Sequence, residues 1–498
     1  MIPIVTPIIK SSASLKFWSK FYDTRLKWLC RRNSTAKVAP KKVLRDNCYQ
    51  STSLDSGLRI ATLPAYGQFT TIGVAIYAGS RNEVHYPPGT AHFLEKISFL
   101  SSQQFPDKAH TLDLLEKFGA LIDCQSTRDT FVYAASCRVE NAFDVLSIIA
   151  DAVLRPNILD NEVEYCRDVI RYENETLSRQ PECEPLLTDW IHQAAFRSNT
   201  VGLSRYCPNK LVDVVNSGHI LSFLSQYYTS PRIVLAGVGV DQQFLVEAGK
   251  ELFDPRETTW EKHPERLLTH LPTVDESLAQ YTGGEVLIEK DLSQMALGPT
   301  PFPNLAHIVI GFEGVNVSDA DFVPFCVLQS LMGGGGSFSA GGPGKGMYTR
   351  LYVDVLNQHH WIYNATAFNH SYMDSGLFCI RASADPTKLN DLVDIILAEF
   401  GRLTKGVWLE ELERAKVQLK SQLLMNLEMR PVQFEDLARQ MLAHGQRKTA
   451  DEYSELIDRV ENTDIIRIAH KMLDSRLSIV GYGDLRNMPT YKNIESRL

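Results

Sequence analysis

The chain has 498 residues, of which 44% are hydrophobic and 22% charged, and its formal net charge is −8. This balance is that of an ordinary globular protein, and the length predicts roughly two to four domains. No apolar run reaches the roughly 18 residues that a membrane-spanning helix requires.

The first 45 residues differ in composition from the rest of the chain. They hold eleven Lys or Arg and one acid, Asp23, so their net charge of +10 leaves −18 for the remainder. A basic, amphipathic and nearly acid-free segment is typical of a mitochondrial transit peptide. A nucleic-acid-binding arm, a membrane-binding arm and a merely disordered tail are the alternatives, although the acidic body argues against nucleic acid as a partner. In this arm the apolar residues recur at helical spacing: Leu15, Trp18, Tyr22, Leu26 and Leu29. The basic residues occupy the other faces of that helix: Lys16, Lys20, Arg25, Lys27, Arg31 and Arg32.

Residues 46–253 predict a first domain in which helices pack on a sheet. Strands that alternate apolar and polar residues, such as Thr70–Tyr77, occur together with amphipathic helices, which indicates an α+β fold. A Rossmann fold is disfavoured, because the sequence has no GxGxxG turn and no strictly alternating strand–helix units.

A helix that begins near Gly89 carries His92, Glu95 and Lys96 on adjoining faces. The spacing is that of the HxxEH motif, in which two histidines and a later residue bind zinc and the glutamate is the general base. Glu173, 77 residues after Lys96, is the candidate for the later ligand. Because an ammonium group has no lone pair for a metal, we expect no catalytic residue and no metal site in this chain, only a remnant. A salt bridge from Lys96 to Glu173 or Glu95 is expected to replace the metal, although such a string taken alone is most often a solvated helix face.

A linker and a second domain follow the first. Residues 254–280 contain Pro255, Pro264 and Pro272 and lack sustained periodicity, so they predict the linker. Residues 281–498 predict the second domain.

The two domains are expected to be a diverged repeat. Arg232–Gly239 matches Arg476–Gly483 at an offset of 244, and Thr130–Ser136 matches Gly376–Ala382 at an offset of 246. Three matches in one order predict two homologous domains, each a mainly antiparallel sheet with helices packed on it. The third match is between two long helices, Asn161–Ser178 and Trp408–Leu427.

Residues 333–346 contain eight glycines, between an apolar helix predicted at Phe322–Met332 and a further segment at Met347–Leu356. A phosphate-binding GxxxxGK[ST] loop does not fit, because Ser339 stands where the first glycine belongs and Gly346 where the hydroxyl belongs. A flexible linker and a lid whose glycine amides bind an extended peptide remain as interpretations.

Together these motifs resemble the pitrilysin-type metallopeptidases and, within that family, the non-catalytic alpha-subunit class. The resemblance extends from about Leu58 to Tyr491. Its most specific part is the glycine-rich loop, and the degenerate metal motif with its lysine is shared as well. The stretches that carry it are Met332–Met347, Ala91–Lys96, Tyr281–Gly284, Leu297–Pro301 and His359–Trp361.

The resemblance implies a clam-shell of two domains joined by the linker, and a heterodimer with a beta subunit that carries an intact HxxEH motif and zinc. No cofactor is implied for this chain. The implied role is that of a substrate-recognising subunit, inactive alone, of the endopeptidase that removes presequences from imported mitochondrial proteins. It would act in the matrix and reach the inner membrane only through a complex. One alternative is a structural core subunit of the respiratory cytochrome bc1 complex, a related family. The other is an active peptidase that binds metal in an unusual way.

Presequences are basic amphipathic peptides, and a body with a net charge of −18 attracts them. The resemblance implies that the glycine-rich loop binds these peptides. The residues that carry this implied role are Gly333, Gly334, Gly335, Gly336, Ser337, Phe338, Ser339, Ala340, Gly341, Gly342, Pro343, Gly344, Lys345 and Gly346.

Overall fold

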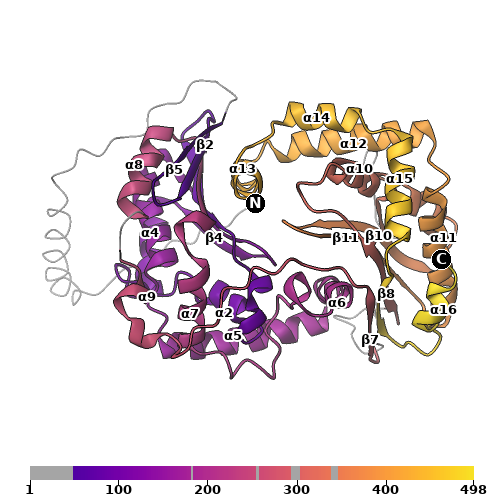
Figure 1. Cartoon of the computed structure of the whole chain (residues 1–498), viewed down its shortest axis with the longest axis horizontal. Coiled ribbons are helices and arrows are strands. Elements are labelled where there is room, and N and C mark those ends of the chain that lie inside the picture. Colours follow the sequence, from indigo (N-terminus) through magenta and orange to yellow (C-terminus); the bar gives the residue numbers. More distant parts are fainter. Residues whose placement is uncertain (1–48, 181–182, 254–256, 293–302, 338–345) are drawn as a thin grey trace, which may run out of the picture. The chain divides into compact units, whose positions relative to one another are not determined.

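The described residues form two six-stranded sheets with helices packed on them, which confirms the predicted α+β class (Figure 1). None of the described helices is both long enough and apolar enough to cross a membrane. The basic arm, residues 1–45, and the stretch Leu297–Pro301 lie outside the described part of the chain. The computed structural model describes residues 49–180, 183–253, 257–292, 303–337 and 346–498.

The first sheet has the strand order β1-β2-β6-β3-β5-β4. β2 and β6 are parallel, and the other neighbours are antiparallel. In β3 the alternation of side chains sends Ile72, Val74 and Ile76 into the main core, whereas Ala75 faces a second cluster on the opposite side. The strands are β1 (Gln50–Ser53), β2 (Arg59–Leu63), β3 (Phe69–Ile76), β4 (Leu121–Ser126), β5 (Phe131–Arg138) and β6 (Ile233–Val238).

Local signals set the ends of several helices in this half. Asp107 accepts a hydrogen bond from the backbone N–H of His110 at 2.7 Å and begins α3, which ends at Gly119 in the left-handed conformation. The helices are α2 (Thr90–Ile97), α3 (Lys108–Phe118), α4 (Ala142–Leu154), α5 (Asp160–Arg179), α6 (Glu184–Phe196), α7 (Ser217–Tyr227), α8 (Gln242–Leu252) and α9 (Thr259–Lys262), with 3₁₀ turns that include η1 (Ser80–His85).

The second sheet has the order β7-β12-β8-β11-β10-β9. Only β7 and β12 are parallel. Its strands are β7 (Gly284–Glu289), β8 (Ala306–Glu313), β9 (Gly334–Gly336), β10 (Ile362–Ser371), β11 (Gly376–Ala384) and β12 (Ser478–Gly483). Its helices are α10 (Phe322–Met332), the π-helix η6 (Leu351–Leu356), α11 (Leu389–Leu403), α12 (Leu409–Asn426), α13 (Arg430–His444), α14 (Ala450–Asp458), α15 (Asn462–Leu473) and α16 (Tyr491–Glu495).

The two sheets repeat one topology, which confirms the predicted duplication. The order β2-β6-β3-β5-β4 corresponds to β7-β12-β8-β11-β10, and each set contains a single parallel pair at the same place. The strands that the sequence matched, β5 with β11 and β6 with β12, occupy equivalent positions. Each sheet also has one additional edge strand, β1 in the first and β9 in the second.

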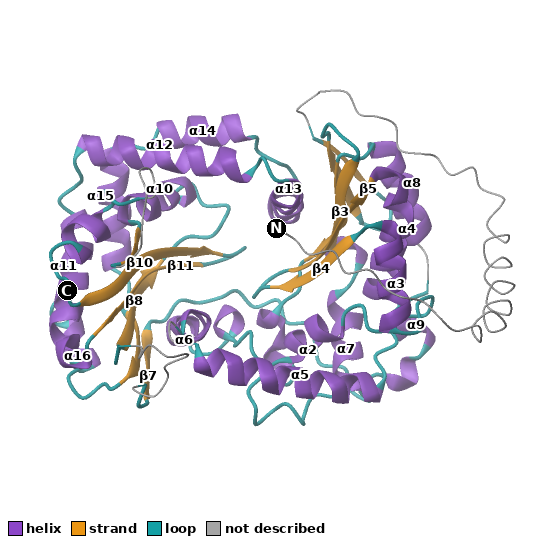
Figure 2. Ribbon diagram, turned by 180° about the vertical axis from the view of Figure 1, so that it is seen from behind, coloured by secondary structure: helices purple, strands orange, loops and turns teal. Residues whose placement is uncertain are grey.

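The two halves exchange a helix. Phe434, Leu437 and Met441 of α13 pack against the first sheet, on the face that carries Ala75 and Val234. In return, α6 of the first half packs on the second sheet, where its apolar side chains join those of β8, β11 and β12. Both helices are visible against the opposite sheet in Figures 1 and 2. Each sheet is therefore covered on one face by its own helices and on the other by a helix from the other half.

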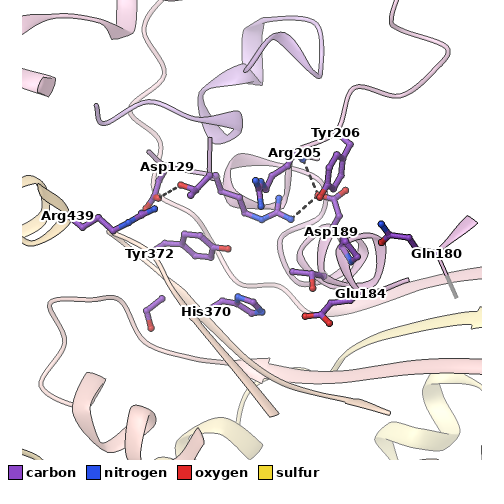
Figure 3. A pocket seen from close by; sticks show the side chains of 14 residues that line it. Asp129, Gln180, Glu184, Asp189, Arg205, Tyr206, His370, Tyr372 and Arg439 are labelled. Carbon is purple, nitrogen blue, oxygen red and sulfur yellow. Dashed lines mark hydrogen bonds and ion pairs between the residues drawn. The ribbon is translucent and has the colours of Figure 1, made fainter. Parts of the chain in front are cut away.

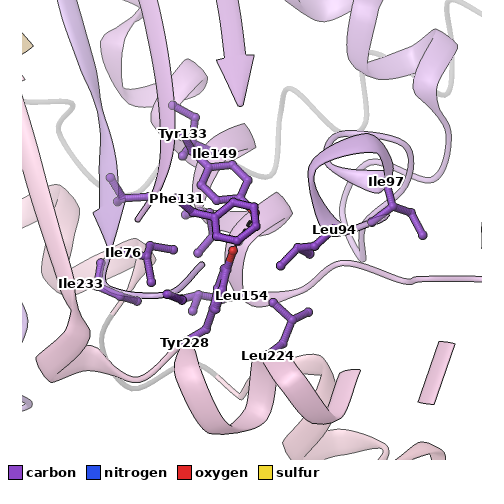
Figure 4. Close-up of a cluster of buried hydrophobic side chains, with 14 of the residues drawn as sticks. Ile76, Leu94, Ile97, Phe131, Tyr133, Ile149, Leu154, Leu224, Tyr228 and Ile233 are labelled. Carbon is purple, nitrogen blue, oxygen red and sulfur yellow. Dashed lines mark hydrogen bonds between the residues drawn. The ribbon is translucent and has the colours of Figure 1, made fainter. Parts of the chain in front are cut away.

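The main core of the first half lies between its sheet and its own helices (Figure 4). Phe131 and Tyr133 extend from β5 toward Ile149 of α4, and Leu94 of α2 lies on the same side. The hydroxyl groups of Tyr133 and Tyr228 are 3.0 Å apart, so this buried polar pair satisfies itself. This core positions α2, which carries the metal-motif remnant.

Candidate functional site

The helix α2 is fixed at its N-terminus by a buried carboxylate. Glu83 of η1 is 1% exposed and accepts the backbone N–H groups of Gly89 at 2.7 Å and Ala91 at 2.5 Å. These N–H groups lack partners within the helix. Burial raises the pKa of Glu83 to about 8, although the two N–H bonds act to lower that pKa. Gly89 has φ of +99°, and a Cβ on it would lie 2.2 Å from Cβ of Cys207, so no larger residue fits this cap.

His92 is buried on the inner face of α2, and both of its ring nitrogens are engaged. The backbone N–H of Cys207 donates to Nδ1 at 3.1 Å, so Nδ1 carries no proton. Nε2 therefore carries the proton and donates it to Oε2 of Glu173 at 3.0 Å. In this tautomer His92 presents no lone pair toward the neighbouring carboxylates.

Lys96 bonds the two carboxylates of the motif. Its Nζ lies 2.8 Å from Oε2 of Glu173 on α5 and 3.0 Å from Oε1 of Glu95. The other oxygen of Glu95 accepts the backbone N–H of Ser126 at 3.1 Å and the Ser126 hydroxyl. The structure thus brings His92, Glu95, Lys96 and Glu173 together, and Lys96 pairs with both of the carboxylates that the sequence offered as alternative partners.

The charges of this cluster are mutually stabilised. Burial acts to raise the pKa of Glu173, but the hydrogen bonds from His92 and Lys96 outweigh it and lower that pKa to about 2. Burial likewise acts to lower the pKa of Lys96, and the bond to Glu173 and the charge of Glu95 outweigh it and raise that pKa. For Glu95 burial is outweighed by Ser126 and Lys96, and its pKa is lowered.

These residues do not fit a catalytic zinc. A charged ammonium group stands one turn from His92, where a second histidine would offer a lone pair, and the His92 proton points at the carboxylate that would be the third ligand. Among the residues that the structure describes, no group of three or more His, Cys, Asp or Glu side chains is arranged to hold a metal.

Several groups of this network were not predicted from the sequence. Ser126 comes from the edge strand β4, and the N–H of Cys207 and the ring of Tyr206 come from the segment after α6. The ring of Tyr206 packs edge-on against His92, with centroids 5.8 Å apart. None of these positions carries a local sequence signal, since their proximity depends on the tertiary fold. Only Glu83 has a weak sequence signal for its contact with α2, because this acidic residue lies six positions before Gly89, the glycine that caps the helix.

A cavity of about 600 Å³ lies next to the cluster, lined by residues of both halves (Figure 3). Arg205 connects the two, since it lines the cavity and donates to the carbonyl of Ser126 at 2.6 Å. The lining of the cavity contains three arginines and three carboxylates: Arg128, Arg205, Arg439, Asp129, Glu184 and Asp189. Because these charges balance, the cavity does not concentrate the negative charge of the body.

Besides Arg439, the second half contributes the uncharged side chains of His370, Ser371 and Tyr372 to this cavity. Burial, assisted by the charge of Arg128, lowers the pKa of His370 to about 4, so its imidazole is uncharged at neutral pH. The hydroxyl of Tyr372 lies 2.8 Å from Nε2 of His192, whose Nδ1 is 2.6 Å from the carbonyl of Thr188. Arg128 forms a buried ion pair with Asp189 at 2.9 Å. Burial lowers the pKa of His192 well below its ordinary value and raises the pKa of Tyr372 to about 12, so the contact between this hydroxyl and this imidazole does not activate a nucleophile.

The glycine-rich loop begins as the edge strand of the second sheet. β9 is antiparallel to β10, with Gly335 opposite Ala365. A Cβ on Gly334, whose φ is +100°, would lie 2.0 Å from the carbonyl oxygen of Ala365, so the strand approaches β10 more closely than any side chain permits. The hydroxyl of Tyr352 donates to the carbonyl of Gly336 at 3.1 Å.

The two described ends of the loop are joined by one side chain. Thr349 Oγ1 accepts the N–H of Gly334 at 3.1 Å and donates to the carbonyl of Gly346 at 2.8 Å. Ser337 is held at the end of β9 by its N–H and hydroxyl, which both bond the carbonyl of Tyr363. The part of the predicted substrate-binding loop between these ends lies outside the described residues: Phe338, Ser339, Ala340, Gly341, Gly342, Pro343, Gly344 and Lys345.

Comparison with known families yields matches for both halves. Residues 59–209 match the model described as insulinase, peptidase family M16. Residues 215–419 match the model described as the peptidase M16 inactive domain. The first match includes the whole of the His92, Glu95, Lys96 and Glu173 cluster, and the second includes the glycine-rich loop.

Individual relatives cover most of the chain. The subunit alpha of the mitochondrial-processing peptidase of Homo sapiens is 48% identical, over 90% of this chain and 84% of its own length. The subunit of the same name from Caenorhabditis elegans is 44% identical, over 89% of this chain and 86% of its own. That from Solanum tuberosum is 31% identical, over 90% and 84%.

Proposed function

The chain belongs to peptidase family M16, and from this we propose that it is the non-catalytic, substrate-recognising subunit of a mitochondrial processing peptidase. Its partner is a beta subunit of the same family that carries zinc and the catalytic residues. The complex removes N-terminal presequences from imported proteins in the mitochondrial matrix. Contact with the inner membrane arises only when the complex belongs to a larger assembly.

The observation that carries this proposal is the Lys96 cluster. A chain with the framework of a metallopeptidase but with an ammonium group at a ligand position has no route of its own to a metal-bound hydroxide. The segments that form the cluster and the glycine-rich strand β9 both lie within the stretches that match the family models. A family scaffold without the metal chemistry supports a role in binding rather than in cleavage. The relatives reported above carry the processing-peptidase name, so we do not retain the cytochrome bc1 alternative.

The substrate class follows from charge and from the loop. The body carries −18 outside its basic arm, which favours basic peptides at long range. Glycine amides such as those of the loop can hydrogen-bond the backbone of an extended peptide without regard to its side chains. Together they suit substrates that share a basic character but no common sequence.

Metal content and peptide cleavage test the proposal. The full-length chain, its co-purified partner and the mixture are each assayed for zinc and for cleavage of a fluorescent presequence peptide. We expect zinc in the partner only and cleavage in the mixture only. About one zinc per chain in the isolated full-length protein, or cleavage by it alone, contradicts the proposal.

A variant that restores the second histidine of the HxxEH motif provides a matched control. Lys96→His places two histidines one turn apart next to Glu173, which is the ligand set of a HxxEH site. We expect weak zinc binding in this variant and none in the double variant His92→Ala/Lys96→His. Cleavage is not expected to return with the metal alone, because Ser126 still holds Glu95.

A further inference from the structure

The helix α12 exposes apolar side chains that its packing does not require. Leu409, Val417, Leu424 and Met425 are 72%, 59%, 50% and 62% exposed. Val417 and Leu424, seven residues apart, share one face of the helix, Met425 adjoins that face, and Leu409 is exposed at the first position of the helix. The buried residues of the helix are Leu412, Ala415 and Lys416. These four exposed residues are called the α12 surface below.

The repeat provides an internal comparison. α5 is the counterpart of α12 in the first half, and its outward positions are mainly charged, with Tyr165 and Tyr172 as its exposed large apolar residues. A helix at this place in the fold is therefore stable with a polar outer face. The fold does not require the exposed aliphatic side chains and methionine of α12. Exposed apolar surface of this kind marks binding sites.

The α12 surface adjoins the end of the glycine-rich loop. Tyr348, two residues after Gly346, is 72% exposed and its ring lies 6.0 Å from the guanidinium of Arg414 on α12. Arg414 also donates to the carbonyl of Tyr348 at 3.0 Å. On the other side, Ser330 of α10 donates to the carbonyl of Ala415 at 3.1 Å, so α12 is fixed to the helix that leads into the loop. In Figure 1, α12 lies beside both α10 and α14.

The charges around the α12 surface favour a basic ligand. Glu410 and Glu428 are exposed, and neither forms an ion pair within the described part of the chain. The two lysines of the helix are neutralised, because Lys416 pairs with Glu413 at 2.9 Å and Lys420 pairs with Asp458 at 2.6 Å. Arg414 is exposed and contacts Tyr348 without a carboxylate partner in the described part of the chain, so the two unpaired carboxylates outnumber it by one. An apolar strip beside unpaired carboxylates complements a helix that is apolar on one face and basic on the others. Residues 12–34 of this chain, with their apolar and basic faces, have this pattern.

We propose that the α12 surface binds the apolar face of a basic amphipathic presequence helix, next to the glycine-rich loop that engages the same peptide. This deepens the proposed function and rests on it. The apolar contact supplies affinity, and Glu410 and Glu428 select basic peptides. A site that recognises only the amphipathic character of a peptide binds peptides of many sequences, because hydrophobic burial is not directional.

A binding assay with a defined peptide tests this assignment. The probe is a fluorescein-labelled synthetic peptide of residues 12–34, and binding to the full-length chain is followed by fluorescence anisotropy. The α12 variant is Val417→Gln/Leu424→Gln/Met425→Gln. The matched control is Tyr165→Gln/Tyr172→Gln on α5, which changes equally exposed apolar residues on the repeated helix. Thermal unfolding of both variants verifies that they are folded.

We expect the α12 variant to bind the peptide about tenfold or more weakly, and the α5 variant to bind it as the wild type does. A second peptide, in which the five apolar residues of the 15–29 face are serine, is expected to bind all three proteins equally weakly. Equal binding of the first peptide by the wild type and the α12 variant overturns the assignment.

Two further results separate this inference from the proposed function. If the α12 variant no longer co-purifies with the catalytic partner, the surface is a subunit interface and the inference is wrong, while the function stands. If a deletion of residues 338–345 abolishes cleavage but the α12 variant binds and cleaves normally, only the α12 assignment fails. If neither change affects peptide binding or cleavage, the substrate-recognising function itself fails.

Discussion

At the scale of single residues, Lys96 places a cation between the two carboxylates of the cluster. The carboxylates of Glu95 and Glu173 are about one-fifth and one-third exposed, and in that setting two negative groups side by side need a positive neighbour. The Lys96 ammonium supplies it to both. His92 completes the arrangement by donating to Glu173 and accepting from the backbone of Cys207.

Removal of the Lys96 charge therefore destabilises the first half. Lys96→Met keeps the aliphatic stem but leaves both carboxylates without their ammonium partner, and we expect a loss of about 1–3 kcal/mol in the free energy of unfolding at pH 7. Urea unfolding of the wild type and the variant measures it. Lys108→Met, at the exposed start of α3, serves as the control and is expected to change stability by less than about 0.5 kcal/mol.

The same network predicts a pH dependence. Glu173 has its pKa lowered from 4.5 to about 2, so its ionised form contributes stability that is complete above pH 4.5 and is lost as the pH falls toward 2. The difference in stability between the wild type and Lys96→Met should accordingly narrow as the pH falls from 6 to 3. Urea unfolding at several pH values in that range measures it. A constant difference would show that Lys96 acts through packing and not through its charge.

The sequence identifies the centre of this site but not its surroundings. His92, Glu95 and Lys96 lie together because a helix places positions three and four apart on one side, and that rule needs no tertiary information. Glu173 was found through the spacing of a known motif. Ser126 and the N–H of Cys207 come from segments that the fold alone brings to the helix. A backbone donor has no sequence signature at all.

At the scale of elements, the glycine-rich segment combines a fixed base with a loop. β9 is held by β10, by Tyr352 and by Thr349, which also bonds the far end at Gly346. The close approach of Gly334 to the backbone of Ala365 requires a glycine at that position. The eight glycines did not predict a strand, because glycine is depleted in strands and β9 forms only through its partner.

The loop is expected to act in catalysis through substrate capture. Deletion of residues 338–345 leaves the bonds of Thr349 and β9 in place, and we expect kcat/KM for a presequence peptide to fall about tenfold or more, because the peptide is no longer positioned. Assembly with the partner and its zinc content should not change. Steady-state cleavage by the reconstituted complex measures the effect. An equal-length Ser/Asn-rich loop that retained full activity would show that the segment is only a spacer.

At the scale of the whole molecule, the exchange of α6 and α13 makes the two halves interdependent. One face of each sheet is buried under a helix of the other half. In each half, the helix that crosses over comes directly after the longest helix of that half. The sequence predicted the duplication, since β5 and β11 retain matching residues. It did not predict the exchange, because an amphipathic helix shows which of its faces is apolar but not which sheet that face will contact.

This exchange predicts cooperative unfolding. Leu437 on α13 and Ile191 on α6 are fully buried at equivalent places of the repeat. We expect Leu437→Ala and Ile191→Ala each to cost about 2–5 kcal/mol, and each to shift a single transition seen by both circular dichroism and tryptophan fluorescence. Two separate transitions, with only one moved by each variant, would show that the halves unfold independently.

The basic arm is expected to direct the chain into mitochondria. Its eleven positive charges favour movement toward the negative side of a membrane potential, and its apolar stripe suits amphipathic recognition. We expect a chain without residues 1–45 to remain outside isolated mitochondria and yet to pair with the catalytic subunit when the two are mixed.

Residues 1–45 fused to a reporter protein should carry that reporter into mitochondria. The same fusion with Lys16, Lys20, Arg25 and Lys27 changed to Gln should be imported much less. Protease protection after import measures all three. If the truncated chain is still imported, the targeting information lies in the body, and if it cannot pair, the arm is part of the assembled structure.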